Sequence, residues 1–339
     1  MTTIADLFSQ HELVDYSANR TYPVMLGDTL FPTRRVEALT LDVLSRSTKV
    51  PILANVAGFD TEAEIGSREA NKQVQDLALI KRKMQIKEQD LYALLNPRTP
   101  QEGDYLRNNV YGDFDVLNQG VLAQIERMAM ELLATGKVTL NPDDKKSGVL
   151  DYQVPKTHQV AATTAWDSDD ADPLNDLFDW SDMLDITPTR AITSKKLYRA
   201  FTRNAKVIAA VFGKDSGRVV GQADLDTFLE AQGLPIIRPY GDKYKTQGAN
   251  GKFTTKTYWP DDKIALFDDE IVGEKIFGPT PEELANLSDV QGSTVANIYD
   301  MVYTESKDPV GTFEKASAVA LPSLAEPDQI LQATVTLSK

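Results

Sequence analysis

The 339-residue sequence contains no cysteine and only two histidines, His11 and His158. The missing cysteines exclude a disulfide framework, a cysteine-ligated zinc site and a thiol nucleophile. The two histidines lie far apart without metal-ligand spacing, so each is interpreted as a surface residue or a satisfied core residue. We therefore expect no metal site built on these residue types.

Long apolar runs and a basic N-terminal start are also missing. Residues 1–16 have neither the positive charge nor the continuous apolar stretch of a signal peptide. The longest apolar runs, such as residues 207–212, are far too short to cross a bilayer. The net charge is −14, and an acidic protein repels nucleic acid and anionic membranes. The composition argues against a membrane partner and against a DNA-binding role.

Motifs for catalysis and ligand binding are scarce as well. No Gly-x-Ser-x-Gly nucleophile turn occurs. Gly251-Lys252 resembles the end of a phosphate loop, but Thr246 and Phe253 stand where that loop needs glycine and a hydroxyl residue. The aspartates of residues 167–172 lack the glycine and the closing glutamate of a calcium loop, and fit an acidic helix N-terminus. The sequence thus predicts no catalytic, cofactor-binding or metal-binding residues.

The clearest element that is present is an amphipathic helix over residues 116–136. Asp113 or Asp115 is expected to cap its start, and Gly136 to take the left-handed conformation at its end. β patterns lie before and after this helix, which suggests that it is a central helix, or spine, from which other elements project. Its apolar stripe recurs at helical spacing in Leu117, Val121, Ile125, Met128 and Leu132.

Two β patterns before this helix predict a projecting arm. Residues 36–44 alternate in polarity and residues 79–86 return as a second strand, with the polar segment 45–73 between them. An isolated two-stranded hairpin is marginal in water, so the arm is expected to find its packing partner outside its own domain. Residues 98–112 are interpreted as a turn-rich connector to the helix.

The rest of the chain alternates between short helices and strands. Helices are expected over residues 4–13, 87–96, 173–184, 194–203, 223–232 and 281–287, and strands over 157–165, 190–193, 263–267, 295–304, 316–321 and 330–337. Hairpins are expected around residues 141–148 and at Asn250-Gly251, which is a strong turn signal. With 42% hydrophobic and 25% charged residues, the chain is globular and long enough for two or three domains.

Charge is distributed in blocks. Residues 167–185 hold eight acids and no base, whereas basic residues gather in the second strand of the arm. Solvated faces are the simpler interpretation; the alternative is a basic arm that reaches an acidic patch on a neighbouring copy. The candidate intersubunit contacts are Arg35, Lys72, Lys81, Arg82, Lys83, Lys87, Asp268, Asp269 and Glu270.

The order of these parts resembles the lambda-type major capsid protein of tailed phages, the E family. The resemblance covers most of the chain and depends on several short segments in order. These are Leu30-Phe-Pro-Thr-Arg-Arg35, Arg98-Thr-Pro100, the helix end and hairpin start at residues 126–138, Asp308-Pro309, Ala318-Val-Ala-Leu-Pro322 and Pro327-Asp328.

The resemblance implies an α+β chain with the Hong Kong 97-type capsid fold. Under it, residues 1–34 form an N-terminal arm and residues 35–87 an extended β-hairpin loop. Residues 88–186 and 295–339 form a peripheral domain around the spine helix, and residues 187–294 form an axial domain.

The resemblance also implies a function. The chain is expected to be a major capsid protein that self-assembles into hexamers and pentamers of an icosahedral phage head, through a procapsid, around double-stranded DNA. Expected partners are a scaffolding protein in trans, a portal and a decoration protein, with synthesis and assembly in the host cytoplasm. Two alternatives stay open. One is an encapsulin-like nanocompartment subunit with the same fold, and the other is a soluble α/β enzyme with a deep polar pocket in residues 187–294.

Overall fold

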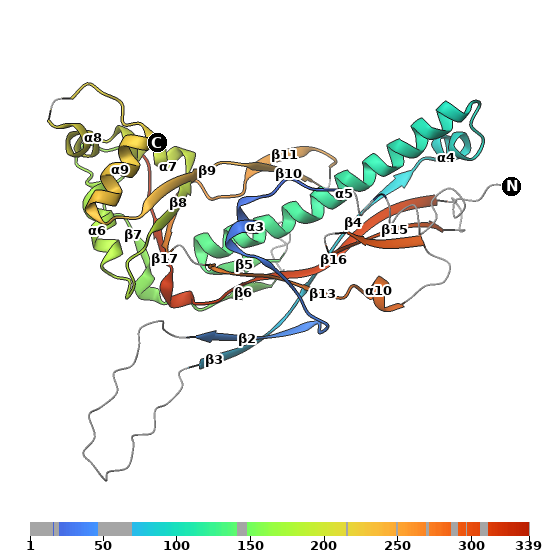
Figure 1. The fold of residues 1–339 in the computed structure, drawn as a ribbon, viewed down its shortest axis with the longest axis horizontal. Coiled ribbons are helices and arrows are strands. Elements are labelled where there is room, and N and C mark those ends of the chain that lie inside the picture. Colours follow the sequence, from blue (N-terminus) through green and yellow to red (C-terminus); the bar gives the residue numbers. More distant parts are fainter. Residues whose placement is uncertain are drawn as a thin grey trace, which may run out of the picture.

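Two β-sheets joined by one long helix form the body of the protein, and a narrow ribbon projects from it (Figure 1). The structure is a computed structural model. It describes residues 16, 20–46, 70–140, 148–214, 216–248, 250–268, 271–285, 291–295, 297–305 and 311–338, without the side chains of 41–46, 70–75 and 291–295. The expected helix over residues 4–13 lies outside this part of the chain.

The long helix is α5 (Pro100–Thr135), which has 36 residues and is therefore longer than expected. Its start is set by Thr99, whose hydroxyl accepts a hydrogen bond from the Glu102 amide at 3.2 Å, and by the proline at its first position. The prediction of a connector over residues 98–112 and of a cap at Asp113 or Asp115 was wrong. The predicted end is confirmed, because Gly136 has a φ of 69°.

The first sheet has six strands and packs against α5. The whole predicted stripe of α5, from Leu117 to Leu132, is at most 1% exposed and belongs to the larger hydrophobic core. At the centre of this sheet, β16 pairs with β4 along one edge and with β15 and β13 along the other. The strands are β1 (Thr33–Arg35), β4 (Ala78–Ile86), β13 (Gly273–Gly278), β14 (Gln291–Val295), β15 (Ile298–Glu305) and β16 (Gly311–Leu324).

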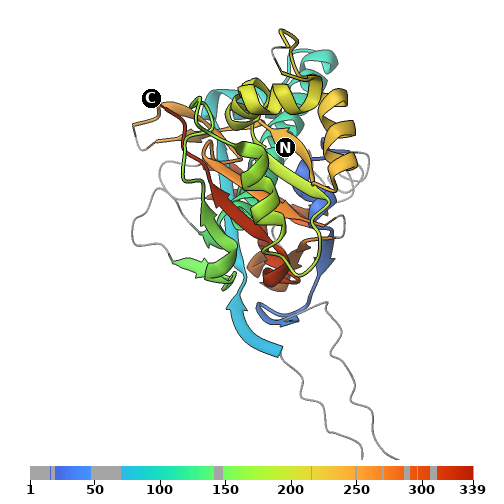
Figure 2. The same ribbon diagram turned by 90° about the vertical axis from the view of Figure 1, so that its left-hand side faces the viewer.

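The projecting ribbon is a two-stranded sheet of β2 (Thr40–Arg46) and β3 (Ala70–Asp76). The predicted arm therefore exists, but the prediction that residues 79–86 form its returning strand was wrong. Those residues are β4, which pairs with β16 in the body, and β3 is the strand that returns from the tip. Figures 1 and 2 show this ribbon extending away from the rest of the chain.

The second sheet has five strands in the order β7-β17-β12-β8-β9. Four helices cover one of its faces and enclose a separate hydrophobic core around Trp166, Phe201 and Leu266 (Figure 2). The strands are β7 (Gln159–Ala161), β8 (Arg190–Ser194), β9 (Ile236–Tyr240), β12 (Lys263–Phe267) and β17 (Leu331–Thr334), and the helices are α6 (Pro173–Ser181), α7 (Lys195–Arg203), α8 (Ala205–Phe212) and α9 (Gln222–Gln232).

The two sheets do not divide where the expected domains divide. The strand β13 lies in residues 187–294 but belongs to the six-stranded sheet, and β7 and β17 lie in the other segment but belong to the five-stranded sheet. The remaining described elements are α3 (Leu26–Leu30), α4 (Glu88–Leu95), α10 (Pro281–Ala285), the hairpins β5 (Lys137–Thr139) with β6 (Val149–Asp151) and β10 (Lys243–Gln247) with β11 (Phe253–Thr257), and the 3₁₀ turns η1 (Lys156–His158) and η2 (Pro327–Gln329).

Candidate intersubunit surfaces

The root of the arm is held by two neighbouring glutamates of α10. Arg35, at the end of β1, forms an ion pair with Glu283 at 3.0 Å, and Lys81 of β4 forms one with Glu282, also at 3.0 Å. Lys315 of β16 forms a third ion pair, with the same Glu282 carboxylate. Since β1 precedes the arm and β4 follows it, α10 ties both ends of the arm segment to the central strand.

We call these three ion pairs of Glu282 and Glu283 the clasp. They are partly buried, and this affects the ionisation of Glu282. Burial acts to raise the pKa of Glu282, but hydrogen bonds from Lys315 and Lys81 outweigh it and lower the pKa to about 2. The start of α10 is further fixed because Thr280 and Glu283 each accept a hydrogen bond from the other's backbone amide, at 3.2 and 2.9 Å. Arg35 and Lys81, predicted to contact a neighbour, thus also have partners in their own chain.

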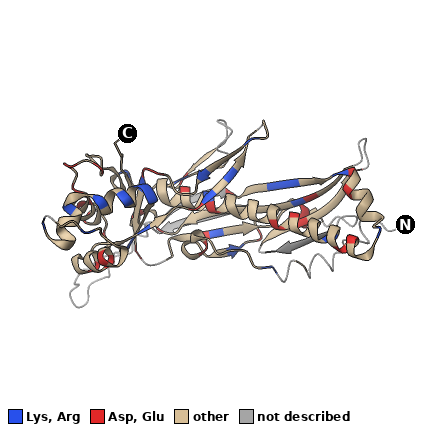
Figure 3. Ribbon diagram, turned by 90° about the horizontal axis from the view of Figure 1, so that it is seen from above, with Lys and Arg blue, Asp and Glu red and all other residues tan. Residues whose placement is uncertain are grey.

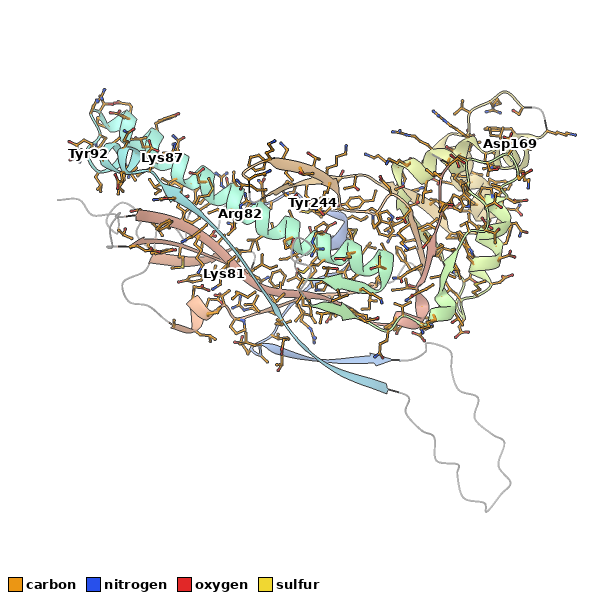
Figure 4. The ribbon with its side chains drawn as sticks, turned by 180° about the vertical axis from the view of Figure 1, so that it is seen from behind. Lys81, Arg82, Lys87, Tyr92, Asp169 and Tyr244 are labelled. Carbon is orange, nitrogen blue, oxygen red and sulfur yellow. The ribbon has the colours of Figure 1, made fainter. Side chains whose placement is uncertain are left out.

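Of the other predicted basic residues, Arg82 and Lys83 lie on β4, Lys87 directly follows this strand, and Lys72 lies on β3 (Figure 4). Lys83 lies 4.0 Å from Glu305 and above the ring of Phe313, whereas Arg82 points to the opposite face and lies beside Gly120 of α5. Lys87 is exposed just before α4 and has no ion-pair partner in the described part of the chain. Lys72 is known only as a backbone position of β3, opposite Leu44.

The three predicted acidic contacts follow β12. Asp268 is the first residue after that strand, and Asp269 and Glu270 lie outside the described residues. The structure therefore brings Arg35 and Lys81 together at α10. The proposal that any of these nine residues meets a neighbouring copy stays a prediction.

A buried ionic network joins the two sheets at the middle of α5. Glu126 is fully buried and its carboxylate accepts hydrogen bonds from the Gly27 amide at 3.0 Å and from the Tyr240 hydroxyl at 2.9 Å. Lys275 of β13, only 4% exposed, lies 3.3 Å from Glu126 and 2.7 Å from Asp28. Burial and the Glu126 charge raise the pKa of the Tyr240 hydroxyl. One carboxylate thus connects α3, α5, β9 and β13.

Two more carboxyl groups are buried between α5 and the six-stranded sheet. Asp300 accepts a hydrogen bond from the Asn118 amide at 2.7 Å, and burial raises its pKa to about 7. Glu314 is fully buried and neither of its carboxylate oxygens has a hydrogen-bond partner among the described residues. Burial and the nearby Asp113 raise its pKa to about 8. Both groups face α5, since Asp300 and Glu314 lie on the same side of neighbouring strands.

Tyr16, Arg20 and Tyr22, which precede α3, pack on α5 next to these groups. The ring of Tyr16 stacks on Tyr111 with centroids 4.4 Å apart, and its hydroxyl donates to Asp115 at 2.9 Å. Arg20 forms an ion pair with Asp115 at 3.1 Å, and the Tyr22 hydroxyl accepts from Asn118 at 2.9 Å. The chain before α3 is therefore held on its own α5 at these three residues.

Two exposed surfaces of opposite charge lie on different parts of the molecule (Figure 3). The β10–β11 hairpin, which runs over α5 in Figure 1, carries four lysines and no acid between Lys243 and Thr257. The acidic segment 167–185 forms α6 and its flanks at the helical end of the body. All of its acids except Asp176 are exposed.

No feature of an enzyme site stands out in the described residues. The pocket of about 280 Å³ at the helical end is lined by Trp166, Asn204 and the charged residues Asp167, Asp169, Arg199 and Arg203. A pocket of about 550 Å³ lies elsewhere, between α4, α5 and the end of β4. The part of the chain that the structure describes contains no cluster of potential metal ligands. Nor does it contain a helix long and apolar enough to span a membrane.

Several of these residues were not predicted from the sequence. Glu282 and Glu283 were within a short predicted helix without an assigned role, and Glu126 lies outside the predicted apolar stripe of the long helix. One local signal indicates that Glu126 is buried: it lies within an apolar part of the helix, with residues 128–130 and 132–133 directly after it.

Comparison with solved structures places the fold among capsid proteins. The chain is similar to the putative capsid protein of a prophage from Escherichia coli CFT073, with a TM-score of 0.63, 13% identity and coverage of 96% of this chain and 99% of that one. It is also similar to a phage-related protein from Bordetella bronchiseptica RB50, with a TM-score of 0.50, 14% identity and 94% coverage of both chains. The SrpI encapsulin of Synechococcus elongatus PCC 7942 has a TM-score of 0.47 at 14% identity, with coverage of 95% and 94%.

The similarity to the prophage capsid protein shows that the chain has an α+β fold of the Hong Kong 97 type, as the resemblance in the sequence implied. The sequence profile of the family described as phage major capsid protein E matches residues 12–335. The chain therefore belongs to the phage major capsid protein E family and is a shell protein of a phage head. A comparison with curated protein sequences gives no match.

Proposed function

We propose that this chain forms hexamers and pentamers that close into an icosahedral head around double-stranded DNA. The observation that supports this most is the family match over residues 12–335. The projecting β2–β3 ribbon is consistent with it, since a two-stranded sheet is marginal in water unless it packs on something else. A neighbouring copy supplies such a surface, and many repeated modest contacts stabilise a shell through multivalency.

The proposal includes partners that act before and after closure. A scaffolding protein in trans directs procapsid assembly, a portal occupies one vertex, and a decoration protein stabilises the mature shell. Synthesis and assembly take place in the host cytoplasm without a membrane, and the chain has no catalytic role. The acidic subunit, with its net charge of −14, encloses DNA without binding a specific sequence and does not retain it electrostatically.

We also propose the domain roles suggested by the sequence. Residues 1–34 act as the N-terminal arm, 35–87 as the extended loop, 88–186 with 295–339 as the peripheral domain, and 187–294 as the axial domain at hexamer and pentamer centres. The sheets refine this division, because β13 packs with the peripheral strands and β7 and β17 with the axial ones.

Deletion of the arm tests the proposal. Replacing residues 47–69 by a short Gly-Ser turn keeps β2 and β3 and all described contacts of the body. We expect this variant to fold, by circular dichroism and thermal melting, but to give no closed particles by negative-stain microscopy. In a matched variant, residues 47–69 are replaced by an unrelated polar sequence of the same length. This variant separates the role of tip contacts from that of arm length. Wild-type protein that stays monomeric with and without its scaffold would refute the proposal.

An encapsulin-like nanocompartment is the second candidate, since that class shares the fold. Neighbouring genes for a portal and a terminase distinguish the two, because only a phage head packages DNA through a portal. Particles that carry a protein cargo and lack a portal vertex would favour the nanocompartment.

A further inference from the structure

The β10–β11 hairpin is a rigid basic projection with an exposed outer face. Its base is fixed by Tyr258, whose ring lies 5.0 Å from Tyr244 and whose amide donates to the Asp242 carbonyl at 3.1 Å. The strand register places Lys243 and Lys245 on the face opposite to Tyr244. Phe253 pairs with Gln247 on that same outer face and is 64% exposed. An exposed aromatic ring beside lysines is typical of a protein contact surface.

The lysines of this face are not neutralised by their own chain. Lys243, Lys245 and Lys252 are exposed and form no ion pair with any described residue. The basic residues of β4 differ, because Lys81 pairs with Glu282 and Lys83 lies close to Glu305. Copies that each carry a net charge of −14 repel one another, so contacts between them are favoured where patches of opposite sign meet.

A matching surface lies on α6 at the helical end. Phe178 and Met183 are 39% and 45% exposed, and the exposed acids Asp179, Asp182 and Asp185 surround them. No ion pair within the described chain engages these three acids; Asp179 accepts only an amide hydrogen bond from Asn175. We call Phe178, Asp179, Asp182, Met183 and Asp185 the α6 patch. It combines apolar and acidic groups in the same way that the hairpin combines apolar and basic ones.

We propose that the outer face of the β10–β11 hairpin docks on the α6 patch of a second copy of this chain. The hairpin runs over α5 whereas α6 lies at the end of the body, so one copy presents both surfaces at different places (Figures 1 and 3). A contact between two different surfaces is heterologous, and a heterologous contact that closes on itself generates a ring. The inference rests on the proposed shell function and assigns residues to a contact within its capsomers. A protein partner is favoured over DNA because Phe253 is exposed among the lysines and the rest of the chain is acidic.

A reciprocal charge swap tests this contact. The hairpin variant is Lys243→Glu/Lys245→Glu, the α6 variant is Asp182→Lys/Asp185→Lys, and the third variant combines all four changes. All four positions are exposed, and Asp182 follows the last turn of α6, where a lysine suits the helix dipole. Each double variant should lower the yield of particles, measured by sedimentation and electron microscopy, about tenfold or more, and the combined variant should restore it to within about threefold of wild type. The control Lys156→Glu/Lys214→Glu makes the same charge change at exposed lysines elsewhere and should assemble normally.

The outcomes separate this inference from the proposed function. Wild-type particles together with normal assembly of the hairpin variant would overturn the docking contact and leave the shell function intact. Defective double variants that the combination does not rescue would also overturn it, as would loss of duplex DNA binding as the only defect of the hairpin variant. Failure of wild-type protein to assemble would instead count against the shell function. In that case mixing the two double variants still tests the contact, because the swapped charges should restore pairwise association in analytical ultracentrifugation.

Discussion

Removing the Glu126 carboxylate should be one of the most damaging single changes to the subunit. In Glu126→Ala, the 4%-exposed Lys275 keeps Asp28 as its one remaining described partner. The Gly27 amide and the Tyr240 hydroxyl lose the acceptor that lies 3.0 and 2.9 Å away. Breaking a buried ion pair by removing one partner costs about 3–5 kcal/mol. Each orphaned buried donor costs about 1–3 kcal/mol.

These costs overlap because they concern the same four groups, so they do not add. We expect Glu126→Ala to lower the free energy of unfolding by about 3–5 kcal/mol, out of a total of about 5–15 kcal/mol for a typical domain. The assay is urea unfolding of the unassembled subunit, followed by circular dichroism and by tryptophan fluorescence. If the slope of the unfolding free energy against urea concentration is unchanged, the loss reflects lower stability rather than a change in the unfolded state.

A double variant serves as the control. Glu126→Met/Lys275→Met removes both charges and fills the space with apolar side chains, and such replacements are often neutral or stabilising. It should therefore be more stable than Glu126→Ala, although Gly27 and Tyr240 still lack their acceptor. A loss of less than about 1 kcal/mol in Glu126→Ala would refute the reasoning, because it would mean that water or Asp28 replaces the carboxylate at no cost.

Three further predictions concern other sites. Glu314 has a pKa of about 8 in the folded chain, against an ordinary value of 4.5. Between these pH values the folded chain holds a proton that the unfolded chain releases, so stability falls as pH rises from 4.5 to 8. Glu314→Gln should remove this pH dependence and be more stable than wild type at pH 8, with the gain shrinking toward pH 5. The same difference in unfolding free energy between the two proteins at pH 5 and pH 8, measured by urea unfolding, would contradict this. Thr99→Ala should cost about 1 kcal/mol by removing the cap of α5, with Thr99→Ser as its control. Gly273→Ala should prevent β13 from pairing with β16, since the added Cβ would lie 1.8 Å from the Ser323 carbonyl oxygen, and a melting temperature within a few degrees of wild type would show that the strand moves aside.

The sequence predicted those elements whose signals are local. The apolar stripe of α5, the caps at Asp172 and Ser194 and the Asn250-Gly251 turn all lie within a few residues of the elements they specify. The first part of α5 was missed because its apolar residues are few and separated by polar ones, although Val110 and Phe114 are buried in the core. Its helical start depends on Thr99 and Glu102 instead.

The sequence could not predict which strands far apart in the chain would pair. The strand at residues 79–86 was recognised, but its alternation is compatible with a hairpin and with a sheet, and β16 lies more than two hundred residues further along the chain. The strand β13 was missed because glycines begin and end it and Glu274 and Lys275 lie within it, which leaves two apolar residues as its only strand signal. For the same reason the charged groups at α10 could be named as basic or acidic but not matched, since Arg35 and Glu283 meet only once β1 has paired with β13 in the six-stranded sheet.

The positions of β16 and β17 in the chain have a consequence for protein synthesis. β16 lies at the centre of its sheet and β17 lies between β7 and β12, and each follows all of its pairing partners in sequence. A nascent chain on the ribosome therefore has β4, β13 and β15 before it has the strand that joins them, and β7 before it has the strand that joins β7 to β12. Fragments released early by damaged messages cannot complete either sheet, and so they lack the rigid body needed to join a growing shell and spoil it.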